Sequence, residues 1–244
     1  MAAILSSTHV EALDALSAKA GGPLLSIDTS TTHTSVCLLG WPNLAPLSYI
    51  DFEAGSVPSQ ALAQGLHEAM VKSKLRASQI KGIAIGLGPG SFTGLRVGLA
   101  TVKGLALGAG MPLYGFSSLA LWALSAGKPN VAVALDARQN EIYSALYACS
   151  DNGTCRALIQ DGTRTPEEFR KELPDSDWVI VGDGQQVFSA DGGPWLESVL
   201  PDAALGLLMV ADKISGGLGD DLRLLNPDYH RITEAERQAR LRRQ

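Results

Sequence analysis

Residues 86–108 read GLGPGSFTGLRVGLATVKGLALG, and this glycine-rich stretch decides how the chain is interpreted. It follows a short apolar run, IKGIAIG, which is typical of a buried strand. From Ser91 onward, apolar residues recur at helical spacing, although each glycine in a helix costs about 1 kcal/mol relative to alanine. The glycines inside this helix therefore either hold a ligand or admit a close approach by protein: they are Gly94, Gly98, Gly104 and Gly108.

A phosphate-binding loop is the first alternative for this stretch. The P-loop pattern GxxxxGK[ST] is absent, because no lysine follows the glycines. The dinucleotide pattern GxGxxG fails as well, since its last position falls on Ser91 or Thr93. A turn at the amino end of a helix can still attract an anion. The stretch therefore has no specific nucleotide-binding signature.

A packing surface is the second alternative. At about 100° per residue, several small or apolar residues fall on one side of the predicted helix. Small residues four positions apart let two backbones approach closely. The surface can lie on the chain's own sheet or on a partner subunit, and periodicity alone does not choose between them. The residues on that side are Gly94, Gly98, Thr101, Leu105 and Gly108, with Arg96 and Lys103 on the opposite side.

Predicted strands and helices alternate along the chain, which indicates an α/β protein with mixed sheets. An apolar strand, an aspartate at its exit, a polar turn and a returning strand occur at Asp28 and again at Asp136. This weak internal repeat suggests two related lobes. A further strand can lie at 44–52. We expect residues 1–22 to form an extension with a short helix, 23–117 a first lobe and 118–244 a second lobe whose end packs back on the first.

Composition narrows the function classes. The 244 residues are 45% hydrophobic and 18% charged, as in globular proteins, and a net charge of −5 argues against a general nucleic-acid surface. The Arg-rich end can touch RNA or an acidic partner, or form a solvated helix. The uncharged run between Lys103 and Lys128 is broken by Pro112, so we expect no membrane span. Three cysteines without CxxC spacing argue against disulfides and for a cytoplasmic protein.

The first hairpin turn is the other candidate for chemistry. Asp28, Thr29 and Ser30 can cradle a phosphate and its Mg²⁺, or form an ordinary Asx turn. The matching second turn lacks a glycine after Asp136 and looks salt-linked through Arg138 and Glu141. The four histidines lie far apart in the sequence and no serine sits in a GxSxG elbow. We therefore predict no catalytic residue and no metal site.

Four segments together resemble the bacterial TsaB (YeaZ) family: LLSIDTSTTHTSVCLL, GIAIGLGPGSFTGLRVGLATVKGLALG, VALDARQNEIYSALY and NPDYHRITEAE. The likeness runs from about Leu24 to Glu236. It implies an actin-like fold of the sugar kinase and Hsp70 superfamily with two duplicated lobes. It also implies a place in the machinery that attaches threonylcarbamoyl to the adenosine beside the anticodon of tRNAs.

The resemblance implies a noncatalytic subunit that binds and stabilises a TsaD-like catalytic subunit. The two first-lobe helices, here Pro58–Lys74 and Ser91–Gly108, would form the contact, which favours the partner over the chain's own sheet. Pro58 stands where the family often has a histidine, which makes metal binding there less expected. The implied contact residues are Leu62, Leu66, Gly94, Arg96, Gly98, Thr101 and Leu105.

Other partners follow from the same resemblance. A TsaE-like ATPase would join the complex, tRNA would be reached through it, and the free chain could form a homodimer. ATP or ADP with Mg²⁺ would bind only in the complex, so Asp28, Thr29 and Ser30 would be a vestigial phosphate turn. The alternative is an active ATPase or small-molecule kinase of the same superfamily, which rests on Asp28 and its hydroxyl-rich turn.

Overall fold

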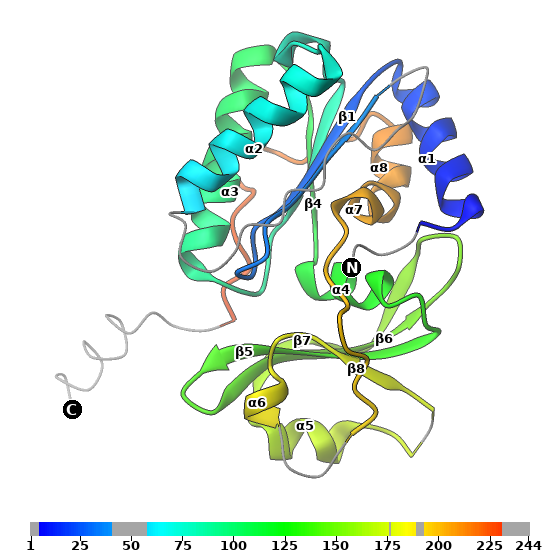
Figure 1. Cartoon of the computed structure of the whole chain (residues 1–244), viewed down its shortest axis with the longest axis vertical. Helices are drawn as coiled ribbons and strands as arrows, with labels where there is room; N and C mark the ends of the chain where they lie inside the picture. Colours follow the sequence, from blue (N-terminus) through cyan, green and yellow to red (C-terminus); the bar gives the residue numbers. More distant parts are fainter. Residues whose placement is uncertain (1–4, 41–57, 176, 189–192, 231–244) are drawn as a thin grey trace, which may run out of the picture.

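The computed structural model describes residues 5–40, 58–175, 177–188 and 193–230, which form two lobes, each built on one β-sheet (Figure 1). The helices are α1 Ser7–Ala20, α2 Pro58–Ser73, the 3-10 turn η1 Ala77–Gln79, α3 Phe92–Ala109, α4 Ser118–Ser125, α5 Pro166–Glu172, α6 Gln185–Phe188, α7 Ala203–Met209 and α8 Ala211–Ser215. The strands are β1 Leu24–Asp28, β2 Ser35–Leu39, β3 Gly82–Gly86, β4 Leu113–Phe116, β5 Asn130–Arg138, β6 Glu141–Cys149, β7 Cys155–Arg164 and β8 Val179–Val181.

The two sheets share a strand order around their first hairpins. In the first lobe the order is β2-β1-β3-β4, with β1 antiparallel to β2 and parallel to β3. In the second lobe the order is β7-β6-β5-β8, with β5 antiparallel to β6 and parallel to β8. Each lobe thus places a hairpin beside a parallel strand reached through a crossover. The predictions of an α/β protein and of mixed sheets flanked by helices are confirmed.

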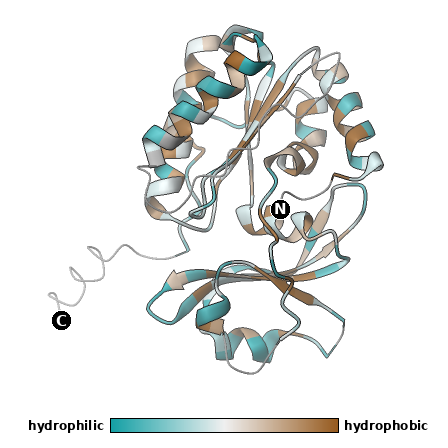
Figure 2. Ribbon diagram, viewed as in Figure 1, coloured by the Kyte–Doolittle hydropathy of each residue, from teal (hydrophilic) through white to brown (hydrophobic). Residues whose placement is uncertain are grey.

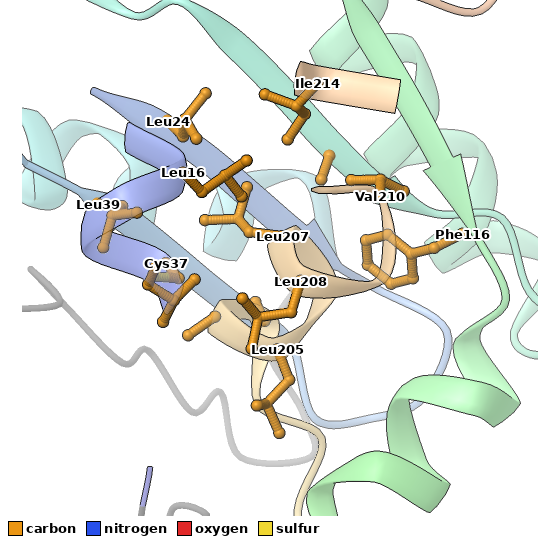
Figure 3. Close-up of a cluster of buried hydrophobic side chains, with 14 of the residues drawn as sticks. Leu16, Leu24, Cys37, Leu39, Phe116, Leu205, Leu207, Leu208, Val210 and Ile214 are labelled. Carbon is orange, nitrogen blue, oxygen red and sulfur yellow. The ribbon is translucent and has the colours of Figure 1, made fainter. Parts of the chain in front are cut away.

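The first sheet is covered by helices on both faces (Figure 1). Alternate residues of β1 point to opposite sides, because side chains in a strand alternate. Leu25 and Ile27 pack with residues of α2 and α3, while Leu24 packs with α1, α7 and α8. Figure 3 shows this second cluster, where Leu16 of α1 and Leu207 of α7 meet on the sheet. Hydrophobic residues run along the strands of both sheets (Figure 2).

Helix α1 lies in the predicted extension and packs against α7 and α8. The sequence suggests a capping box from Thr8 to Glu11, but the helix begins two residues earlier. The Ser6 side chain accepts a hydrogen bond from the His9 backbone N–H at 3.2 Å and caps the helix. Leu13 and Leu16 are buried in the first-lobe core. The extension is therefore part of that core, while the lobe boundaries themselves stay predictions.

The cysteines correct one prediction. Cys149 and Cys155 form a disulfide, and Cys37 is buried as a free thiol. The expectation rested on the missing CxxC spacing, but β6 and β7 form a hairpin that pairs these two residues directly across the strands. Close pairing in space, not short spacing in sequence, joins them.

Two further expectations concern segment ends. The predicted strand at 44–52 lies outside the described residues, as do all the arginines of the Arg-rich end. The apolar segment AALGLLMVADKIS (203–215) predicts one helix from its sequence, but it forms two short helices, α7 and α8, which meet at Val210. None of the helices in the described ranges combines the length and the apolar character needed to cross a membrane.

Candidate functional site

The glycine segment after β3 closes against the first hairpin turn. A Cβ atom on Gly90 would lie 2.8 Å from the Ser30 Cβ, and one on Gly94 would collide with the Thr29 carbonyl oxygen. The backbone N–H of Ser91 donates to the Ser30 carbonyl at 2.6 Å. Only residues without a side chain permit backbones to come this close. The start of the glycine stretch therefore binds the chain's own turn.

Asp28 is the centre of this contact. The backbone N–H and the hydroxyl of Ser30 donate to Asp28 Oδ1 at 3.0 and 2.6 Å, and the Ser118 hydroxyl donates to Oδ2 at 2.6 Å. Ser118 Oγ in turn accepts from the Gly88 backbone N–H at 3.1 Å. The side chain is fully buried, and this burial raises the pKa of Asp28, while the hydrogen bonds from Ser118 and Ser30 oppose the rise.

The structure thus brings the three predicted phosphate-turn residues together but turns them inward. Asp28, Thr29 and Ser30 are buried, and the Thr29 hydroxyl donates to the Gly94 carbonyl at 2.8 Å. Both carboxylate oxygens of Asp28 already accept hydrogen bonds from the chain. A phosphate or a Mg²⁺ ion bound here would have to displace these contacts. The turn therefore serves to pack the hairpin against α3 and α4.

The second hairpin turn is held by charge. Arg138 Nη1 lies 3.1 Å from Asp136 Oδ2, so the salt link joins these two residues. Asp183, in the Gly-Asp-Gly turn after β8, accepts from the Asp136 backbone N–H at 2.9 Å. Burial raises the pKa of Asp183, and the hydrogen bond from the Asp136 backbone N–H opposes the rise.

Sequence reasoning did not identify Ser118 or Asp183 as partners of the two turns. The sequence indicates a turn at Gly-Asp-Gly after a strand, and a helix that begins near Ser118. It does not indicate which residues these two pair with, because Ser118 lies 90 residues from Asp28 and Asp183 lies 47 residues from Asp136. Within the described ranges, no three histidine, cysteine or acidic side chains gather closely enough to hold a metal ion.

The inner sides of α2 and α3 belong to the first-lobe core. Leu62 and Leu66 are buried in the cluster between α2 and the sheet, so neither offers a side chain to a partner. Gly94 and Gly98 are buried against Thr29. This placement removes four residues from the predicted contact surface, because the helical side chosen by periodicity faces the chain's own sheet.

The remaining predicted contact residues are more accessible. Thr101 and Leu105 are half-buried, and the Thr101 hydroxyl donates to the Val97 carbonyl at 2.8 Å. Arg96 is exposed. Of the predicted set, these three residues can take part in a contact without leaving the core.

The outer side of α3 carries small residues without cover. Gly104 and Gly108 are exposed, and a Cβ atom at either position would have nothing within 4 Å. Ala100 is exposed between them and Arg96, and Leu107 is exposed to 71%. At about 100° per residue, Arg96, Ala100, Gly104 and Leu107 form one outward stripe, whereas Gly108 lies on the side of Gly94 and Gly98 and is exposed near the end of the helix. Val71 near the end of α2 is also exposed, to 60%.

An aromatic cluster stands at the amino end of α3. The Arg96 guanidinium lies 3.6 Å from the centroid of the Phe92 ring, and Arg96 Nε donates to the Tyr229 hydroxyl at 2.8 Å. The Phe92 and Tyr229 rings are 5.1 Å apart. Tyr229 comes from the segment after α8, which is tied to the site by a hydrogen bond from the Asp228 N–H to the Leu87 carbonyl. The sequence indicated neither aromatic residue as part of the site.

Comparisons with known proteins agree with this architecture. Residues 56–171 match the family model of TsaD, tRNA N6-adenosine threonylcarbamoyltransferase. The chain is 32% identical to the tRNA threonylcarbamoyladenosine biosynthesis protein TsaB of Escherichia coli over 68% of this chain and 73% of that protein. It is 33% identical to the protein of the same name from Haemophilus influenzae, over 68% and 74%.

A solved structure gives the same result in three dimensions. The structure of YeaZ from Pseudomonas aeruginosa superposes with a TM-score of 0.72 at 29% identity and covers 85% of this chain and 99% of that one. Together with the repeated strand order of the two sheets, this likeness confirms the predicted actin-like fold.

Proposed function

This chain belongs to the TsaB family, and from that premise we propose that it is a noncatalytic subunit for threonylcarbamoyladenosine modification of tRNA. In this proposal it binds a related TsaD-like catalytic subunit through the outer side of α3 and the adjoining side of α2. The family match indicates the process, which is the modification of tRNA. The exposed glycines of α3 indicate the surface that binds the partner.

One observation carries the choice of surface. Gly94 and Gly98 are explained inside the chain, because side chains there would collide with Thr29. Gly104 and Gly108 have no such neighbour, yet each costs the helix about 1 kcal/mol relative to alanine. A second backbone lying close against the outer side of α3 would offset this cost. The exposed glycines Gly104 and Gly108 therefore favour a helix of a partner protein near the end of α3.

The hairpin turn supports the noncatalytic part of the proposal. Asp28, the side chain that a kinase or ATPase would need for its metal-bound water, is engaged by Ser30 and Ser118. We propose that any ATP or ADP with Mg²⁺ acts in the assembled complex, and that tRNA and a TsaE-like ATPase are met there. The alternative of an independent ATPase or small-molecule kinase rests on the turn at Asp28, which is closed by Ser30 and Ser118.

A cellular experiment tests the process. Depletion of the protein should lower the threonylcarbamoyladenosine content of bulk tRNA, measured by nucleoside chromatography and mass spectrometry. Re-expression of the wild-type chain should restore the content, and so should Asp28→Asn, because the proposal gives Asp28 a packing role. Unchanged tRNA nucleosides after depletion would contradict the proposed process. We propose that the tRNA modification takes place in the cytoplasm. We also propose that the chain forms a homodimer when the catalytic subunit is absent.

A further inference from the structure

The helical layer of the first lobe is basic although the protein is acidic. Residues 58–110 contain six lysines and arginines and one glutamate, a formal charge of +5, whereas the whole chain carries −5. Glu68 is engaged by Lys72 at 3.7 Å. The basic residues of this layer are exposed except for half-buried Lys103: they are Lys72, Lys74, Arg76, Lys81, Arg96 and Lys103.

Several of these charges have no acidic partner within the described part of the chain. Among the described residues, no carboxylate lies within ion-pairing distance of Lys74, Arg96 or Lys103. Opposite charges scattered over a surface cancel at a distance, while charges of one sign on one layer create a local field. This layer therefore attracts an acidic surface even though the protein as a whole does not.

Arg96 is held ready for a specific contact. Its guanidinium stacks on Phe92 and its Nε is fixed by Tyr229, while its two terminal nitrogens make no hydrogen bond within the described residues. A guanidinium whose plane is already fixed loses less conformational freedom when it binds a carboxylate with both terminal groups. The Phe92–Tyr229 pair thus positions a cation at the amino end of the proposed docking helix.

The surface between the charges favours protein over RNA. Leu107 and Val71 are exposed to 71% and 60%, and Gly104 leaves open space beside them. Contacts to a nucleic-acid backbone are dominated by cations and polar groups, whereas protein interfaces combine an apolar centre with a polar rim. A second copy of this chain would present the same basic layer, and like charges oppose that pairing.

We propose that the α2–α3 surface binds an acidic helical face of the partner protein, and that Arg96 pairs there with a carboxylate. This inference rests on the proposed function and adds the charge of the partner's surface to it. Such complementarity acts mainly on the rate of association, because opposite fields steer the two proteins together before contact.

Stopped-flow association with the TsaD-like subunit of the same organism tests the inference. We expect the association rate constant to fall by about tenfold from low to high salt. Arg96→Glu should lower the low-salt rate constant and weaken its salt dependence. Arg156→Glu makes the same charge change on exposed β7 of the other lobe and should leave both nearly unchanged. Tyr229→Phe keeps the ring, frees Arg96 Nε, and should mainly raise the dissociation rate constant.

Four outcomes overturn the inference, and they differ from one another. Binding with a salt-independent rate constant that Arg96→Glu does not alter would contradict the acidic partner surface and leave the proposed subunit role intact. An absence of binding at every salt concentration would contradict both the acidic partner surface and the proposed subunit role. Binding of purified tRNA by the isolated wild-type chain, lost in Arg96→Glu, would assign the basic layer to RNA. Self-association in sedimentation that is lost in Arg96→Glu would assign it to a second copy.

Discussion

Gly98 of α3 lies directly over Thr29 of the first hairpin turn, and this approach fixes which side of the helix faces the sheet. A Cβ atom on Gly98 would collide with the Thr29 hydroxyl and lie 3.2 Å from its methyl carbon. The same hydroxyl donates to the Gly94 carbonyl at 2.8 Å and so cannot turn away without losing a hydrogen bond. Gly104 lies about 120° around the helix from Gly98 and meets nothing within 4 Å, so its side of α3 is left for a partner.

Alanine substitutions at Gly98 and Gly104 should have opposite effects on stability. Gly98→Ala should lower the free energy of unfolding by about 1–3 kcal/mol, because it overpacks a filled contact with Thr29. Gly104→Ala should raise it by up to about 1 kcal/mol, because alanine favours the helix and the position is open. Urea unfolding followed by circular dichroism measures both. Equal effects of the two substitutions would show that α3 is rotated relative to the sheet.

The glycine helix shows how far the sequence could be interpreted. Strand, turn and helix around Gly86 were predictable, because apolar runs and glycines mark them locally. The side of the helix that meets the sheet was not predictable from the sequence. The pattern of Gly94, Gly98, Thr101 and Gly108 fits packing on the chain's own sheet as well as on a partner. The difference lies in Thr29, which is 65 residues from Gly94 in the sequence and contacts it only after folding.

The same limit applies to the hairpin turns and the cysteines. The sequence identified Asp28 as a candidate for phosphate binding. Its observed packing role depends on a hydrogen bond from Ser118, which is brought near Asp28 only by folding. Cys149 and Cys155 were judged by their spacing, and their pairing depended on the register of β6 and β7. The aromatic positioning of Arg96 required Tyr229 from a distant segment. Local patterns predict elements, and contacts between distant elements decide the site.

Asp28→Asn should change the pH dependence of stability in a defined direction. Burial raises the pKa of Asp28, so at pH values between the ordinary and the raised pKa the folded chain holds a proton that the unfolded chain has lost. The contribution of Asp28 to stability therefore falls as pH rises through this window. Asparagine does not ionise, so the variant should gain stability relative to wild type from acidic toward neutral pH. Urea titrations that give the same pH slope for both proteins would contradict this.

The Cys149–Cys155 disulfide should contribute modestly to stability. It closes a short turn of six residues' separation, for which loop entropy predicts about 2 kcal/mol or less. Thermal unfolding with and without a phosphine reductant measures this, with the Cys149→Ser/Cys155→Ser double variant as the control that should not respond. Thiol labelling of the folded protein should spare Cys37, because burial raises the pKa of its thiol. Global unfolding on reduction would show that the hairpin depends on the bridge.

The isolated chain should show no saturable binding of Mg-ATP by calorimetry. Ser30 and Ser118 occupy the carboxylate that would hold the metal-bound water, and the glycine segment covers the turn. As the control, Mg²⁺ and ATP are injected separately and their heats of dilution are measured. Saturable binding that Asp28→Asn abolishes would favour the kinase or ATPase alternative.

The most direct measurement is the affinity of the TsaD-like subunit for Gly104→Leu, compared with wild type and with Ala18→Leu. Gly104 is open on the outer side of α3, and Ala18 is exposed on α1, on the opposite face of the sheet. Both variants should unfold within a few degrees of the wild-type chain. We predict that Gly104→Leu weakens binding by about tenfold or more, because the added side chain separates the two helices, and that Ala18→Leu does not. An unchanged affinity of Gly104→Leu would show that the partner does not lie on α3.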